Sequence, residues 1–346
     1  MNNEKFTSLE LSVLSFLIFS NSLSIIIINL FNDTPTLNII LSVAIYFIVG
    51  IVFIKLFLKG FDYYNNLFFK TNIFVKGVFI IFSIIYSLFL MFNLSIIIKE
   101  IILPEMSIVF IGFWFLLIAS VLAFKGIKSI SIAANLFFLI YLITIFISFC
   151  FNLNIVEHIN LLPMNLNSNF PFIKILLLSI GPLFMLHIIS KKDIDNFNKY
   201  KKYLNIFYII FCLYMLLKIL FIVSILGIKY FSFIDYPYIN ILKMINIFDF
   251  FQRMEEVLII NIFIECLITC SLSICYSNSV LNSIIDLKNK SFILIGSVLF
   301  LIFINIDTLS NRFIYICSFV FILINLLNYF FIRKTKWNHL VCFFNI

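Results

Sequence analysis

Ten largely apolar runs follow one another along this chain of 346 residues, separated by charges, prolines or asparagine clusters. A helix of about 20 apolar residues crosses the roughly 30 Å hydrocarbon core of a bilayer. The runs leave no room for a separate soluble domain, so the sequence predicts a single all-α membrane domain over residues 1–346. We expect ten transmembrane helices at residues 9–31, 37–58, 73–98, 107–124, 130–151, 171–189, 204–226, 257–276, 292–306 and 313–332.

The composition supports this fold class. Only 12% of the residues are charged and 63% are hydrophobic, whereas soluble domains carry about 25% charged residues. A soluble enzyme and a nucleic-acid-binding domain are therefore excluded. The net charge of +8 comes from basic residues that flank the apolar runs, where they anchor the chain at the bilayer.

The positions of Lys and Arg predict the orientation in the bilayer. The connectors that would share a side with both termini hold 17 of the 24 basic residues, and the opposite connectors hold six. The remaining one, Lys218, lies inside the seventh run. Because cytoplasmic connectors are enriched in Lys and Arg, both termini are expected in the cytoplasm.

The residues that could catalyse a reaction or bind a metal are not spaced as they are in active sites or metal sites. The seven cysteines lie in or beside apolar runs without a CxxC pair, and we expect them to be buried as small hydrophobes. His158, His187 and His339 are scattered, and His187 is expected at the membrane interface. No metal, cofactor or enzymatic activity is predicted.

Two runs contain a polar interruption about ten residues from their start. The run 171–189 contains Gly181-Pro182, and the run 9–31 contains Ser20-Asn21-Ser22-Leu23-Ser24. Proline removes a helical hydrogen bond, and glycine permits unusual dihedral angles. Because these are the first and sixth of ten runs, the pattern indicates an inverted five-plus-five repeat with discontinuous helices 1 and 6.

In transporters of that architecture, the ends of broken helices bind a small substrate at mid-membrane. Helix N-termini favour anions and free carbonyls favour cations, so a zwitterionic amino acid is a natural ligand. Alternatively, the Gly-Pro pair is an ordinary kink and the Ser/Asn cluster packs helices together. The predicted ligand site comprises Ser20, Asn21, Ser22, Ser24, Tyr86, Gly181, Pro182, Glu265 and Thr269.

The eighth run contains a polar stripe. Asn261, Glu265, Thr269 and Ser273 recur every four residues and fall on one face of a helix. Charge at membrane depth usually faces a cavity, so the stripe could line a vestibule for a ligand or a cation. Hydrogen bonding between helices is the alternative. Lys218 could pair with Glu265 or extend to the interface.

The segment before the eighth run carries the most specific motif of the chain. It contains a proline, a basic–apolar pair, Asp-Phe and Arg-x-acid, in that order; the matching residues are Pro237, Lys243, Ile245, Asp249, Phe250, Arg253 and Glu255. This order resembles a signature of the endospore germination permeases, the membrane-embedded B subunits of nutrient germinant receptors. Similar motifs at Leu103-Pro104, 125–128 and 161–163 extend the resemblance over nearly the whole chain.

The permease family is similar to the amino acid–polyamine–cation (APC) transporters, which have the inverted-repeat fold. The resemblance implies a subunit in the spore inner membrane or plasma membrane that binds an amino-acid-type nutrient. It further implies signalling to an A-type membrane subunit and a C-type lipoprotein. A secondary amino-acid transporter coupled to H⁺ or Na⁺ is the alternative. The chain departs from the family pattern at Ile262, at Thr269, at 183–185 and in the lack of glycine in the first run, which leaves ion coupling and ligand identity open.

Overall fold

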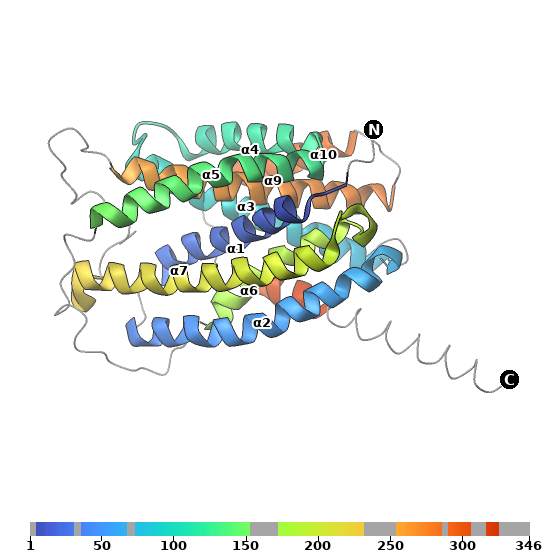
Figure 1. The fold of residues 1–346 in the computed structure, drawn as a ribbon. Coiled ribbons are helices and arrows are strands. Elements are labelled where there is room, and N and C mark those ends of the chain that lie inside the picture. The colour runs from blue at the N-terminus through green and yellow to red at the C-terminus, as the bar shows by residue number, and fades with distance from the viewer. Residues whose placement is uncertain are drawn as a thin grey trace.

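The computed structural model describes residues 5–30, 36–67, 73–152, 172–231, 254–285, 290–305 and 316–324, and these form a bundle of helices. The helices lie side by side with their long axes roughly parallel (Figure 1). In chain order they are α1 (Ser8–Leu30), α2 (Thr36–Leu67), α3 (Ile73–Ile101), α4 (Ile108–Phe124), α5 (Ile127–Asn152), α6 (Phe172–Leu183), the 3₁₀ helices η4 (Phe184–Ile188) and η5 (Lys191–Asp193), α7 (Phe197–Phe231), α9 (Met254–Asn282) and α10 (Lys290–Asn305). Residues 316–324 are also helical.

Five helical stretches within the described residues are long and apolar enough to cross a bilayer. They are Ile40–Phe61, Ile73–Ile101, Ile127–Ile147, Phe197–Leu220 and Ile259–Asn282. Shorter apolar stretches occur at Ser8–Asn21, Ile108–Phe124 and Ile175–Ile188. The chain is thus all-α with several potential membrane spans, while the number of ten crossings and their orientation stay predictions.

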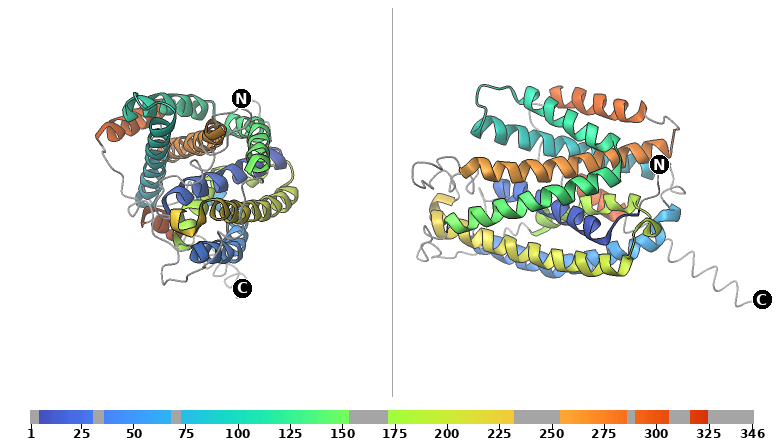
Figure 2. Two further views of the ribbon diagram at one scale, coloured as in Figure 1. Left: turned by 90° about the vertical axis from the view of Figure 1, so that its left-hand side faces the viewer. Right: turned by 45° about the horizontal axis from the view of Figure 1, so that its top comes forward.

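Helix α9 lies at the centre of the bundle. Of its apolar stretch, 89% is buried, against 28–50% for the other four long stretches. It contacts α1, α3, α4, α5 and α10, and the end-on view in Figure 2 shows it between α3, α4 and α5. Because α9 has almost no lipid-facing surface, its polar side chains must find partners inside the protein.

Local sequence signals fix the ends of α4. The Ser107 side chain accepts a hydrogen bond from the amide of Phe110 at 3.2 Å, as a helix N-cap does. After the last residue, Lys125 is followed by Gly126 with a φ of 91°. Glycine adopts this left-handed conformation without a steric penalty, so the chain turns sharply from α4 into α5.

The start of the chain is tied to the connector that follows α6. The Phe6 amide donates to the Asp193 carbonyl at 2.7 Å, and the Phe6 carbonyl accepts from the Asp195 amide at 2.9 Å. Lys128, at the start of α5, reaches Glu10 of α1 with its Nζ 2.8 Å from Oε2. These contacts hold α1, α5 and the end of α6 together at one end of the bundle.

Helix α1 is continuous, so the predicted discontinuity of helix 1 is wrong. The helix extends from Ser8 to Leu30 through the Ser/Asn cluster. The Ser20 hydroxyl donates to the Leu17 carbonyl at 3.1 Å, and Ser12 bonds in the same manner to the preceding turn. Serines that satisfy themselves in this way are compatible with a helix, and α1 contains no Gly or Pro that would break it.

Helix α6, in contrast, changes its hydrogen-bonding pattern at Pro182. The α-helix ends at Leu183 and the chain continues as the 3₁₀ helix η4 to Ile188. Proline has no amide hydrogen, so the carbonyl four residues earlier lacks its helical donor. The predicted break in the sixth run is thus a change of helix type with a locally altered set of carbonyls.

Gly50 of α2 allows Tyr208 of α7 to pack against the α2 backbone. The Tyr208 hydroxyl donates to the Tyr46 carbonyl at 2.9 Å, and a Cβ at position 50 would lie 1.8 Å from that hydroxyl oxygen. Gly50→Ala is therefore expected to lower the free energy of unfolding by about 1–3 kcal/mol, the usual effect of overpacking. Thermal unfolding of the detergent-solubilised chain measures this. Gly296→Ala is the matched control, since no described atom lies within 4 Å of a Cβ there; equal midpoints for both variants would contradict the packing.

Candidate functional site

Buried polar side chains gather around the contact between α1 and α9, with further members from α3, α5 and α7. All are at most 9% exposed although they lie within apolar helices. Polar groups in such surroundings are costly unless they are hydrogen-bonded or paired. We call this set the polar cluster: Ser20, Asn21, Tyr86, Tyr141, Thr144, Lys218, Asn261, Glu265, Cys266 and Thr269.

Glu265 is the charged centre of the polar cluster. Its carboxylate interacts electrostatically with the Lys218 ammonium of α7 and with the Tyr141 hydroxyl of α5. The Lys218 Nζ also lies 5.8 Å from the centroid of the Tyr214 ring, a cation–π distance. Opposite charges compensate each other's desolvation inside a protein. Lys218 therefore lies within electrostatic range of Glu265, and a direct ion pair between the two stays a prediction.

Asn21 and Tyr86 bring hydrogen-bond donors to another side of the cluster. The Cys266 thiol donates to Asn21 Oδ1 at 3.2 Å, and Tyr86 also approaches Cys266. Among the described residues, Asn21 Nδ2 and the Tyr86 hydroxyl have no hydrogen-bond partner, although these side chains are only 0% and 1% exposed. A buried donor without a partner costs about 1–3 kcal/mol. Asn21 and Tyr86 therefore each hold a buried donor whose cost is not offset within the described residues.

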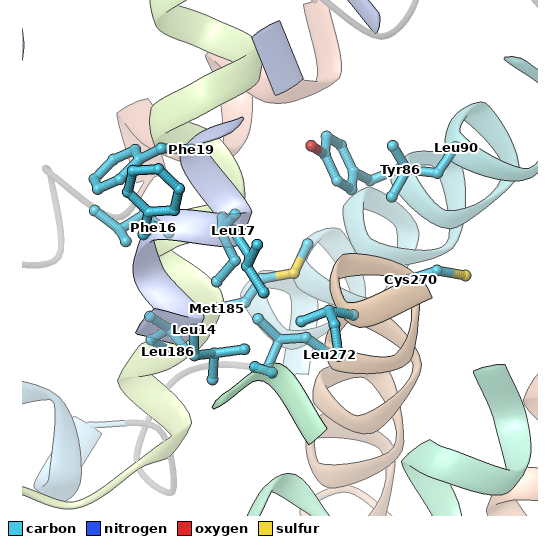
Figure 3. Close-up of a cluster of buried hydrophobic side chains, with 14 of the residues drawn as sticks. Leu14, Phe16, Leu17, Phe19, Tyr86, Leu90, Met185, Leu186, Cys270 and Leu272 are labelled. Carbon is cyan, nitrogen blue, oxygen red and sulfur yellow. The ribbon is translucent and has the colours of Figure 1, made fainter. Parts of the chain in front are cut away.

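Apolar side chains border these donors. Figure 3 shows the Tyr86 ring extending from α3 in the direction of α1, with Leu17 and Met185 lying between the two helices. Leu17 and Met185 are both 0% exposed. Cys270 of α9 is directed away from α1. A hydrogen bond made in such water-poor surroundings is stronger than the same bond in water.

The junction of α6 and η4 lies next to the polar cluster. A Cβ at Gly181 would be 3.4 Å from Phe82 Cζ and 3.8 Å from Ser318 Cβ. The Phe82 ring stacks on Phe321 with 3.9 Å between centroids, and its centroid is 5.8 Å from that of Tyr86. Gly181 and Tyr86 therefore both lie beside the Phe82 ring. The Ser318 hydroxyl, also buried, has no partner among the described residues.

The polar stripe on α9 serves several neighbouring helices. Asn261 accepts a hydrogen bond from Thr144 of α5, and Ser273 shares one with Ser87 of α3. Residues four apart on an α-helix are rotated by about 40°, so a stripe of this length winds around the helix. Hydrogen bonding between helices, the alternative reading of the stripe, therefore accounts for its two ends, while Glu265 at its centre faces α5 and α7.

The structure brings several of the predicted ligand-site residues together. Ser20, Asn21, Tyr86, Glu265 and Thr269 belong to the polar cluster, although the Thr269 hydroxyl donates to the Glu265 carbonyl of its own helix at 2.7 Å. The Gly181-Pro182 pair borders it. The side chains of Ser22 and Ser24 lie outside the described residues, as do the signature residues Pro237, Lys243, Asp249, Phe250 and Arg253; Glu255 lies in the first turn of α9.

Sequence reasoning misses other members of this region, including Tyr141, Cys266 and Ser318. Nothing in their spacing separates them from the many tyrosines, cysteines and serines of the apolar runs. His187, expected at the membrane interface, is buried inside the protein, and its depth in the membrane stays a prediction. Its side chain is 2% exposed, its Nε2 lies 2.9 Å from the Phe57 carbonyl, and its ring stacks on that of Phe57. The 3₁₀ turn after Pro182 packs His187 against α2.

A family model described as spore germination protein, of the spore permease type, matches residues 15–312. The chain belongs to the spore germination protein family. The resemblance to the endospore germination permeases is thereby confirmed, and the chain is a germination-related integral membrane protein. The family is transporter- or receptor-like and is not a known enzyme family.

No curated protein matches this family member significantly. Within the described part of the chain, no group of three or more His, Cys, Asp or Glu side chains is placed to hold a metal ion. The polar cluster of this spore germination protein supplies hydrogen-bonding and charged side chains.

Proposed function

We propose that this spore germination protein is a nutrient-sensing subunit that binds a small amino-acid-type germinant at the polar cluster and signals to partner subunits. The observation that carries the proposal is the pair of unpartnered, fully buried donors on Asn21 and Tyr86 beside the charged residues Glu265 and Lys218. Natural proteins rarely leave such groups unpartnered, and exceptions occur at binding sites.

The cluster offers complementary groups for each end of an amino acid. The carboxylate of the ligand accepts hydrogen bonds from Asn21 Nδ2 and the Tyr86 hydroxyl. The ammonium group is attracted to Glu265 and to the carbonyl, four residues before Pro182, that lacks a helical donor. Apolar neighbours such as Phe82 and Met185 then contact the third substituent and select among nutrients.

The position of the site suggests how binding is passed on. A ligand shifts a conformational equilibrium only by its differential affinity for the two states. The α6–η4 junction leads directly into the connector at residues 190–195, which is hydrogen-bonded to Phe6. A ligand that repositions Gly181 would therefore move this end of the bundle, where an A-type membrane subunit and a C-type lipoprotein would read the change.

The proposal includes the inverted five-plus-five repeat of the APC transporters, with a continuous helix 1, in a spore inner membrane or plasma membrane. Contacts between helices support it. In such a repeat each of the first five spans has a counterpart five spans later, and counterparts near the symmetry axis touch. Four pairs in contact correspond to such counterparts: α1 with α6, α2 with α7, α3 with α9, and α4 with α10.

A secondary amino-acid transporter is the second candidate, and the buried Glu265–Lys218 pair favours it. Ionisable residues at membrane depth often serve coupled transport of protons or ions. Vesicles that contain this chain alone, loaded with a pH or Na⁺ gradient and offered radiolabelled amino acids, separate the candidates. Gradient-dependent accumulation supports the transporter, whereas saturable binding without accumulation supports the sensor.

The sensor function is tested in spores that lack the gene for this chain and are complemented with either the wild-type gene or Asn21→Leu. We expect a standard L-amino acid to trigger germination in the wild type, and the variant to need a concentration at least tenfold higher, because one buried hydrogen bond to a charged group is lost. Ser12→Ala, at a serine bonded only to its own helix, is the matched control. Equal concentration dependence in all three strains would refute the assigned site.

A further inference from the structure

A groove lies between α4 and α10, and none of its lining residues belongs to the polar cluster. Its volume is about 500 Å³. The left-hand view in Figure 2 places both helices at the periphery of the bundle. Leu117, Val121 and Phe124 line the groove from α4 and are 39%, 53% and 55% exposed, so it is open to the surroundings of the protein.

The groove exists because α4 and α10 touch only over part of their length. A Cβ at Gly112 would lie 2.2 Å from Phe303 Cε1, and the Phe113 and Phe300 ring centroids are 5.3 Å apart. Further along α10, Gly296 also lines the groove, and no described atom lies within 4 Å of a Cβ there. The helices are therefore in close contact at Gly112 and leave an open space toward the other end of α4.

The polarity of the groove changes at that end. Its length is lined by aliphatic and aromatic side chains with two hydroxyls, and the Ser120 hydroxyl donates to its own helix at Leu117. Lys125, the cap residue of α4, supplies the only positive charge among the lining residues and is exposed. Among the described residues its ammonium forms no ion pair, whereas Lys128 nearby in the sequence is paired with Glu10.

We propose that this groove binds one acyl chain of an anionic phospholipid, whose headgroup phosphate pairs with Lys125. An apolar channel that ends in a single cation at a helix end matches an amphiphile with one anionic end. A helix is about 10 Å wide and does not fit into a groove of this size, which lies in the range of small-molecule sites. The cytoplasmic side predicted for Lys125 is the side where anionic headgroups attract lysines. This inference is independent of the proposed function.

The test uses the full-length chain in bilayer nanodiscs made from equal amounts of phosphatidylglycerol and phosphatidylcholine. Native mass spectrometry after gentle release counts the lipids that remain bound. We expect one phosphatidylglycerol to be retained preferentially by the wild type. Lys125→Gln should lower the ratio of retained phosphatidylglycerol to phosphatidylcholine about fivefold, the effect of one lysine beside an anionic surface. Lys199→Gln, which removes an exposed lysine at the start of α7, should leave that ratio unchanged.

Two further variants test the acyl chain. Ser297→Trp and Val121→Trp fill the groove from opposite walls at exposed positions, and both should abolish the retained lipid while the protein stays monodisperse. Unchanged retention in both tryptophan variants, or the same lipid ratio for Lys125→Gln and wild type, would overturn the proposal. So would a photo-crosslinker at Val121 in native membranes that captures a polypeptide instead of a lipid.

Discussion

Replacing Tyr86 with Phe is expected to raise the germinant concentration for half-maximal response about 10- to 100-fold without lowering the stability of the unliganded chain. The variant removes a single hydroxyl that has no partner among the described residues. A hydrogen bond from this hydroxyl to a charged ligand group is worth about 1.5–3 kcal/mol, which corresponds to that change in affinity. Germination of complemented spores gives the concentration dependence, and thermal unfolding of the purified chain gives the stability.

Tyr200→Phe is the matched control for this prediction. Its hydroxyl, equally buried, lies 3.2 Å from Ser15 Oγ, so its removal breaks an existing hydrogen bond. We expect Tyr200→Phe to lower the free energy of unfolding by about 0.5–1.5 kcal/mol and to leave the germinant concentration dependence unchanged. If Tyr86→Phe behaves like Tyr200→Phe, the Tyr86 hydroxyl is structural and does not contact the ligand.

Removing one member of the Lys218–Glu265 pair is expected to destabilise the chain strongly. Lys218→Met or Glu265→Gln alone leaves one buried charge without its opposite, which costs about 3–5 kcal/mol in proteins. The double variant should recover much of this loss because no uncompensated charge remains. Thermal unfolding of the wild type, both single variants and the double variant in nanodiscs gives the coupling energy.

Lys76 provides a control for this comparison of single and double variants. Its Nζ donates to the Ser283 carbonyl at 3.2 Å, and its side chain is 6% exposed. Ser283 lies 18 residues beyond Glu265, just after α9 ends, so Lys76→Met and Glu265→Gln should destabilise additively. Additive losses for the Lys218 pair as well would contradict their interaction across α7 and α9.

The sequence predicts the secondary structure of this chain well, because an apolar segment inside a bilayer must form its backbone hydrogen bonds internally, as a helix does. Helix α3 begins at Ile73 and α4 ends at Phe124, at the same residues as the corresponding apolar runs. The change of helix type at Pro182 is also predictable, since proline cannot supply a helical donor wherever it stands. The Ser/Asn cluster of α1 does not force the helix to break, because its serine hydroxyls can bond to carbonyls of the same helix.

The composition of the site is harder to predict, because periodicity along one helix does not identify the helices around it. The sequence identifies Glu265 as a charge at membrane depth and Lys218 as a possible partner, but its neighbour Tyr141 depends on how α5 packs against α9. The same holds for His187, whose burial follows from the 3₁₀ turn beside α2. These contacts arise from tertiary packing that no single segment of the sequence encodes.

The central claim is that a small zwitterion binds beside Asn21 and Tyr86. It is tested most directly by the melting temperature of the full-length chain in nanodiscs, titrated with each standard L-amino acid. Ligand binding to the folded state raises the melting temperature with concentration. We predict a saturable rise with at least one amino acid in the wild type, shifted to at least tenfold higher concentration in Tyr86→Phe. No rise with any amino acid, or identical titrations of the two proteins, would contradict the account.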